Sequence, residues 1–97
     1  MKQIRALIKE PGKVGRIEEI PNTLEDLQKL VGGYIETFTF ASDAVVICNE
    51  EGRLKNLPYN CDFCGVSFVG TIIFAGVDGE EFSDAPDVLE KIINFKG

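Results

Sequence analysis

The stretch from residue 20 to residue 37 constrains the fold most, because it places a short helix, a glycine stop and a strand in immediate succession. Its first half carries one apolar stripe at helical spacing, made up of Leu24, Leu27, Leu30 and Val31. Gly32 and Gly33 then supply the left-handed residue that ends a helix at low cost. A helix of about two turns is unstable alone because nucleation is costly, so the stripe must pack against a sheet.

The two ends of this stretch carry further signals. Asn22 or Thr23 can cap the start of the helix, and an acid three residues later, Glu25 or Asp26, can complete a capping box. Residues 34–40 read Tyr-Ile-Glu-Thr-Phe-Thr-Phe. This content of aromatic, apolar and Thr side chains is typical of a strand, which would supply part of the sheet.

The first twenty residues predict a hairpin. Residues 2–9 alternate, with Ile4, Ala6 and Ile8 on one side of a strand. A Pro-Gly turn then returns the chain as a more polar strand over residues 14–20. Because Val14, Arg16, Glu18 and Ile20 share one face of this second strand, we expect it at an edge of the sheet.

The middle of the chain alternates between apolar runs and turns. Residues 44–48 are almost wholly apolar, which predicts a strand buried on both faces. Residues 53–65 lose any period and predict a loop. Residues 66–77 form the longest apolar run, and Gly70 and Gly76 within it indicate a bulge or a close approach of another backbone segment.

The C-terminal region predicts a second helix. Ser83 to Asp87 combine a capping residue, a proline in the first turn and acids at the positive end of the helix. The apolar stripe that follows consists of Val88, Leu89, Ile92 and Ile93. The element order is therefore β-β-α-β-β-β-α. We expect one α+β domain over residues 1–97, with one mostly antiparallel sheet of about five strands and two short helices on one face.

A series of short motifs runs in order along nearly the whole chain: an Ile-Arg-Ala-Leu opening, Glu10-Pro11-Gly12, Leu-x-x-Leu-x-x-Leu-Val-Gly-Gly-Tyr-Ile from Leu24 to Ile35, Cys48-Asn49-Glu50-Glu51-Gly52, Asn56-Leu57-Pro58-Tyr59-Asn60, and Gly70-Thr71 with Gly76-Val77-Asp78-Gly79. Together they resemble the DUF3846 family, small uncharacterised proteins of Gram-positive gut bacteria, phages and mobile elements. The resemblance implies no catalytic residue, because the family has no established activity. The family's loop usually continues from Leu-Pro-x-Asn to a basic or polar residue, whereas Cys61-Asp62-Phe63-Cys64 follows here.

Cys61 and Cys64 form a Cys-x-x-Cys pair and are the candidates for metal ligands. A structural zinc site needs four ligands, and the chain has no His, so we expect no metal. Thioredoxin-like redox chemistry needs a helix N-terminus beside the thiolate, and no βαβ pattern surrounds the pair. We therefore expect two reduced thiols in or under a surface loop, and no cofactor.

The polar turn and loop of residues 49–60 provide the candidate ligand-binding residues, which are Asn49, Glu51, Arg53, Asn56, Tyr59 and Asn60. Asn and Tyr offer hydrogen-bond donors and acceptors, and Arg offers a fork for a carboxylate or a phosphate. The competing interpretation is that the Asn side chains satisfy the loop's own backbone, as such residues commonly do.

Composition excludes several functions. The net charge is −6 and no basic stripe exists, so we do not expect direct binding of nucleic acid. No apolar run reaches about 18 residues and the first residues lack the pattern of a signal peptide, so we expect neither a membrane span nor a location outside the cytoplasm. With no His, pairs of Ser or Cys with His are excluded.

These observations favour a non-enzymatic binding module, which the resemblance would link to phages or mobile elements. The alternative is a thiol-based redox or small-molecule enzyme that uses residues 49–65. For the binding module we expect a protein partner with a basic surface, because many acids lie in or beside turns, on the polar edge strand or at the start of the last helix: Glu18, Glu19, Glu50, Glu51, Asp78, Glu80, Glu81, Asp84 and Asp87. The competing interpretation is that these acids only keep the domain soluble.

Overall fold

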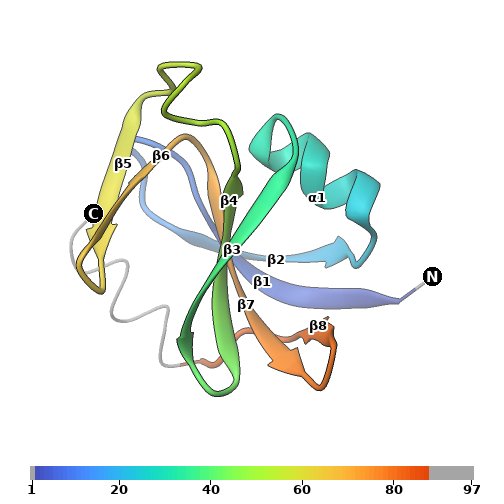
Figure 1. Cartoon of the computed structure of the whole chain (residues 1–97). Coiled ribbons are helices and arrows are strands. Elements are labelled where there is room, and N and C mark those ends of the chain that lie inside the picture. Colours follow the sequence, from blue (N-terminus) through green and yellow to red (C-terminus); the bar gives the residue numbers. More distant parts are fainter. Residues whose placement is uncertain (1, 88–97) are drawn as a thin grey trace.

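An antiparallel sheet of six strands forms the centre of the structure, a computed structural model that describes residues 2–87. In chain order its strands are β1 (Gln3–Lys9), β2 (Arg16–Pro21), β3 (Ile35–Ala41), β4 (Ala44–Asn49), β7 (Ile72–Asp78) and β8 (Glu81–Ser83). Their spatial order is β2-β1-β7-β4-β3, and β8 pairs with the end of β7. The sheet twists so strongly that its strands cross one another in projection (Figure 1).

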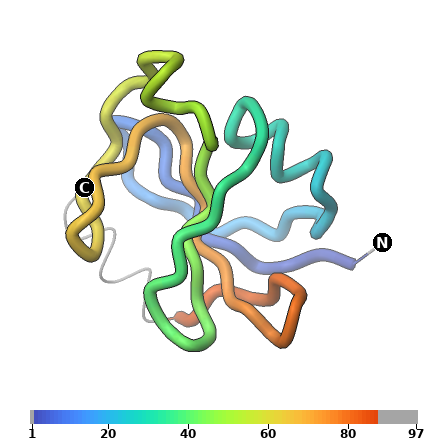
Figure 2. The backbone as a smooth tube through the Cα atoms, in the orientation of Figure 1, coloured from blue at the N-terminus to red at the C-terminus, as the bar shows by residue number. Residues whose placement is uncertain are grey.

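Two further elements cover the two faces of this sheet. Helix α1 (Leu24–Val31) lies on one face, and a separate hairpin of β5 (Tyr59–Phe63) and β6 (Val66–Val69) lies on the other. Figures 1 and 2 show the helix and the hairpin on opposite sides of β3 and β4. Strand β4 lies between both layers and is buried on both of its faces, as its apolar sequence predicted.

The alternation of side chains along β1 and β7 divides the core into two clusters. On the helix side, Leu27 and Val31 of α1 pack with side chains of the sheet such as Ile8 and Ile73. On the hairpin side, Phe68 of β6 packs with side chains that include Leu7, Val46 and Phe74. The predicted grouping of Ile4, Ala6 and Ile8 on one side of β1 is confirmed, because all three belong to the helix-side cluster.

Helix α1 begins and ends as predicted. The Thr23 hydroxyl accepts the backbone N–H of Asp26 at 3.2 Å, so Thr23 is the N-cap. Gly32 adopts a left-handed conformation with φ of 83°, and its N–H donates to the Gln28 carbonyl at 2.8 Å. One detail differs, because Leu24 is 58% exposed and does not belong to the buried stripe.

The strands 35–41 and 44–49 pair as expected, with Ile35 opposite Asn49 and Thr39 opposite Val45. Strand β2 lies at one edge of the sheet, as its polar sequence predicted, and β3 lies at the other. Of the two glycines in the apolar run, Gly76 shows the expected close approach of another backbone segment, whereas Gly70 packs against a side chain. A Cβ atom at Gly70 would lie 2.8 Å from Leu57, and one at Gly76 would contact the backbone of Asp84.

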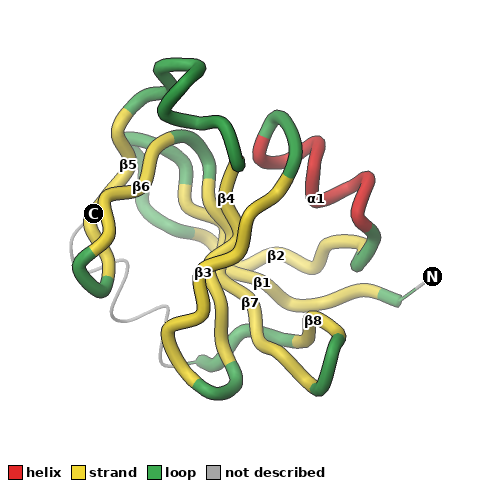
Figure 3. The backbone as a smooth tube through the Cα atoms, viewed as in Figure 1, coloured by secondary structure: helices red, strands yellow, loops and turns green. Residues whose placement is uncertain are grey.

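The fold prediction was wrong in three respects within residues 2–87, and one of them is β8, a strand that was not expected. Residues 53–65 do not form a loop throughout, because residues 59–63 become β5, and the apolar run 66–77 forms two strands rather than one. The described part is therefore mostly β, with one helix (Figure 3). The expected second helix, with its stripe of Val88, Leu89, Ile92 and Ile93, lies outside the described residues, and Ser83, its expected cap, is the last residue of β8.

Candidate functional site

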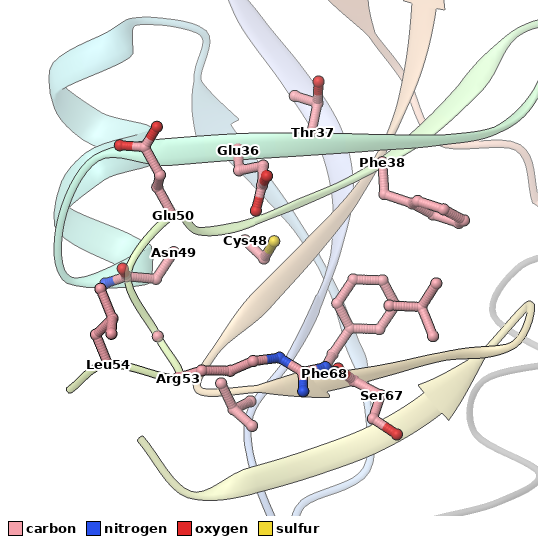
Figure 4. A pocket seen from close by; sticks show the side chains of 13 residues that line it. Glu36, Thr37, Phe38, Cys48, Asn49, Glu50, Arg53, Leu54, Ser67 and Phe68 are labelled. Carbon is pink, nitrogen blue, oxygen red and sulfur yellow. Dashed lines mark hydrogen bonds between the residues drawn. The ribbon is translucent and has the colours of Figure 1, made fainter. Parts of the chain in front are cut away.

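A groove of about 290 Å³ opens where the edge of the main sheet meets the separate hairpin. Its walls come from β3 at residues 36–38, from the end of β4 and the turn after it at residues 48–50 and 52–54, and from β6 at residues 66–69 (Figure 4). The first two segments are connected through the β3–β4 pair, and the third comes from the separate hairpin. The groove exists because β6 packs across the sheet face beside β3 and β4 instead of joining the sheet.

Apolar and thiol groups line the inner part of the groove. The rings of Phe38 and Phe68 meet edge to face with centroids 6.0 Å apart. Cys48 is half-buried, and its sulfur points toward the groove (Figure 4). Burial raises the pKa of the Cys48 thiol, and the nearby Glu36 carboxylate raises it further. The thiol is therefore held in its neutral, weakly nucleophilic form.

Charged side chains surround this apolar part. Glu36 of β3 and Glu50 after β4 are both exposed, and within residues 2–87 neither takes part in an ion pair. Arg53 lies along the opposite wall, where its guanidinium donates to the Ser67 carbonyl of β6 at 2.6 Å. The groove thus carries two carboxylates against one guanidinium, and its net charge is negative.

The structure brings only two of the six predicted ligand-binding residues, Asn49 and Arg53, to the groove. Asn49 is 6% exposed, and both ends of its amide are occupied. Its Nδ2 donates to the Val31 carbonyl at 3.1 Å, and its Oδ1 accepts the Glu51 N–H at 2.7 Å. Asn49 therefore joins the end of α1 to the turn after β4. This agrees with the competing interpretation, in which the Asn side chains bond to backbone groups of the protein.

The other four candidates lie elsewhere. Asn60 is buried, and its Nδ2 donates to the carbonyls of Lys9 and Gly70, at 2.8 and 2.7 Å. It therefore joins the hairpin to the sheet. Glu51 is exposed and pairs with Lys55 at 3.7 Å. The two remaining residues, Asn56 and Tyr59, are exposed outside the groove, with Asn56 in a left-handed conformation (φ of 55°).

Sequence reasoning missed the groove residues of β3 and β6, above all Glu36. One signal was present in the sequence. Alternation along residues 35–40 places Glu36 on the same face as Phe38 and Phe40. A carboxylate on a strand face with two aromatic rings is unusual and indicates a candidate site residue. For Ser67 and Phe68 no such signal exists, because their position depends on how the hairpin folds back over the sheet.

Cys61 and Cys64 take different positions on the hairpin. Cys61 is half-buried against the hairpin-side core, where burial raises the pKa of its thiol and the positive charge of Lys9 opposes that shift. Cys64 is exposed and forms a two-residue turn with Gly65, both at positive φ. Neither residue lies at a helix N-terminus. Within the described part, no three Cys, Asp or Glu side chains gather as a metal site would need.

We expect the three cysteines to differ in reactivity. Iodoacetamide at pH 8 should modify Cys64 first, about tenfold faster than Cys48 or Cys61, because only thiolates react and burial suppresses the thiolate of the latter two. Intact-mass analysis with peptide mapping measures the order. In denaturant all three should react alike. Faster modification of Cys61 in the folded protein would show an activated thiol and favour redox chemistry.

Several acids expected to attract a partner instead neutralise neighbouring cations. Arg16 pairs with Glu10 and Glu18, and Arg5 pairs with Asp87 at 2.8 Å. Further ion pairs join Lys2 to Glu81 and Lys55 to Glu51. These exposed ion pairs reduce the negative charge that the acids could present together. A partner with a basic surface stays a prediction, and the acids of the groove that are unpaired within residues 2–87 are the place where we expect it to bind.

Comparisons with known proteins place the chain in a family. Within residues 2–87, no helix has the length and the apolar character that crossing a membrane requires. No curated protein and no solved structure shows significant similarity to the chain. One family model, described as a domain of unknown function, matches residues 4–95. Because this match covers nearly the whole chain, as the ordered motifs predicted, the protein belongs to the DUF3846 family.

Proposed function

We propose that this protein is a non-enzymatic binding module, and that the groove between β3 and β6 receives a protein partner with a basic surface. One observation carries the proposal. The groove combines an apolar interior, formed by Phe38, Phe68 and Cys48, with the exposed carboxylates of Glu36 and Glu50. Such a site favours a side chain with an apolar body and a positive end, as Lys and Arg have.

The groove supports an enzymatic role less well. A nucleophilic thiol needs a lowered pKa or an adjacent base, whereas burial and Glu36 raise the pKa of Cys48. Arg53 is the one cation among the groove residues, and it already donates to the Ser67 carbonyl. The thiol-based or small-molecule enzyme therefore remains the second candidate.

Affinity capture from a native lysate tests the proposal when three baits are compared. The first is the unaltered protein. The second carries Glu36→Lys and Glu50→Lys, which reverse the charge of the groove. The third carries Glu25→Lys and Glu80→Lys, which change the total charge equally at exposed sites outside the groove. We expect a protein that the first and third baits retain and the second loses, and that elutes as salt rises.

The same experiment separates the alternatives. Retention of identical proteins by all three baits, or of none, would contradict a role for the groove. A small molecule that copurifies with the unaltered protein, detected by native mass analysis and lost from the second bait, would favour the small-molecule enzyme instead.

A further inference from the structure

Strand β3 borders the groove, and its outer edge is unpaired in the part of the chain that the structure describes. It ends the sheet on that side, and no strand within residues 2–87 pairs with its outer edge. Natural proteins usually protect such edges with Lys, Pro, bulges or very short strands. The opposite edge strand, β2, carries Arg16 and ends at Pro21. Strand β3 has seven residues, Ile-Glu-Thr-Phe-Thr-Phe-Ala, and its bulge affects only the end near Ala41.

The alternation of hydrogen bonds between β3 and β4 identifies which backbone groups of β3 are free. The Glu50 N–H donates to the Tyr34 carbonyl at 2.8 Å, and the register of β3 and β4 continues directly from this pair. In an antiparallel pair, residues that bond to the partner strand alternate with residues that face away from it. Glu36 and Phe38 therefore bond to β4, whereas the N–H and C=O groups of Thr37 point to the open edge.

The side chains on this edge define what an added strand would meet. Glu36 and Phe38 point into the groove, and Thr37 points away from it (Figure 4). A strand laid along the edge places its own side chains about 5 Å from those of the residues opposite. Over the groove, one of them would face the Glu36 carboxylate and another, two positions away, would face the Phe38 ring.

We propose that β3 binds an extended segment of a partner protein by strand addition, and that this segment carries a Lys or Arg and a large apolar residue two positions apart. Backbone hydrogen bonds to Thr37 supply affinity that does not depend on sequence, and the groove supplies the selection of side chains. Charge complementarity with Glu36 and Glu50 favours the basic residue. The inference rests on the proposed binding role of the groove and adds the mode of binding and the chemistry of the partner.

Synthetic peptides test the mode directly. The first probe is a seven-residue peptide, the length of β3, that alternates Thr with Lys and Leu. The second has the same sequence with alternate amides N-methylated, so that it keeps its side chains and loses the donors for an edge. The third is a scrambled sequence that puts Lys and Leu on opposite faces. In an NMR titration we expect the first to bind at least about tenfold more tightly than either of the others.

Two proline variants supply the matched test on the protein. Thr37→Pro removes an outward N–H without breaking a bond to β4, and we expect about tenfold weaker binding of the first peptide. Glu19→Pro makes the same kind of change on β2. The Asn22 N–H donates to the Lys2 carbonyl, and the same alternation along β2 directs the backbone N–H of Glu19 away from β1. We therefore expect Glu19→Pro to leave binding of the first peptide unchanged. Thermal unfolding of both variants checks that they fold.

The outcomes distinguish this inference from the proposed function. If the N-methylated peptide binds as tightly as the first, or Thr37→Pro has no effect, strand addition is wrong, although loss of binding with Glu36→Lys would still support the groove as a site. If no peptide binds, the inference is wrong, and the lysate capture decides the proposed function alone. Self-association that Thr37→Pro abolishes would assign the edge to a second copy of the chain and overturn the inference.

Discussion

Replacing Gly76 with alanine should lower the free energy of unfolding by about 3 kcal/mol. Gly76 is buried in β7, opposite Ser83 of β8. An added Cβ would overlap the Asp84 carbonyl oxygen and would lie 2.7 Å from the Ser83 Oγ. One of these obstacles is backbone, so a side-chain rotation cannot relieve the overlap. Strand β8 or the segment after it must move.

The expected movement has a local signature. The chain after β8 is fixed to β1, since the Ala85 N–H donates to the Arg5 carbonyl at 2.7 Å and the Arg5 N–H donates to the Asp84 carboxylate at 2.7 Å. In Gly76→Ala, hydrogen exchange at Ala85 and Arg5 should accelerate more than exchange in the rest of the sheet.

Gly79→Ala is the matched control, because Gly79 lies in the turn between the same two strands. Its φ of 66° makes alanine strained there, but no atom lies within 4 Å of an added Cβ. We expect a loss of about 1 kcal/mol, from backbone strain alone. Urea unfolding of the two variants compares the effects. An equal loss in both would show that β8 does not pack on Gly76 as described.

Most of the main sheet, though not β8, could be predicted from the sequence because its signals are local. The run Ala44 to Cys48 is almost wholly apolar, Thr23 and Gly32 flank the helix, and Gly79 lies in the turn that follows β7. Each signal depends on residues close together in the chain. The exposure of Leu24 marks the limit of such reasoning, because helical spacing predicts a stripe but not how far the sheet extends beneath it.

The hairpin and the groove could not be predicted in the same way. Residues 59–63 read Tyr-Asn-Cys-Asp-Phe and lack the β-branched residues of a strand. Their turn uses Cys64 at a positive φ where Asn or Asp would be typical. The groove joins Glu36 to Ser67, which lie far apart in the chain, so it appears only once the hairpin packs on the sheet. Arg53 was predicted from its chemistry, but its contact with β6 was not.

The hairpin should depend on the ring of Phe74 for its position. Phe74 is fully buried on β7, and its ring meets that of Phe63 at 5.2 Å between centroids and that of Phe40 at 6.2 Å. The rings of Phe40 and Phe63 are 4.9 Å apart, so three strands from both sheets share one aromatic cluster. A two-stranded hairpin is marginally stable alone, and β5 and β6 therefore rely on this contact.

Phe74→Ala should lower the free energy of unfolding by about 4 kcal/mol and should also release the hairpin locally. Ile73→Ala is the matched control, because Ile73 is the preceding residue on β7, is equally buried and faces the helix side. We expect it to cost about 3 kcal/mol without a local effect on the hairpin. Hydrogen exchange of the β5 and β6 amides, compared with the global unfolding of each variant, measures the difference.

The groove gives this comparison a second readout. Because β6 forms one wall of the groove, release of the hairpin in Phe74→Ala should weaken binding of the alternating Thr, Lys and Leu peptide, whereas Ile73→Ala should retain it at temperatures where both variants are folded. Equal protection of the hairpin amides in the two variants would contradict the role of Phe74 in holding it. Unchanged peptide binding in Phe74→Ala, with the hairpin released, would instead show that the edge of β3 binds without the wall that β6 provides.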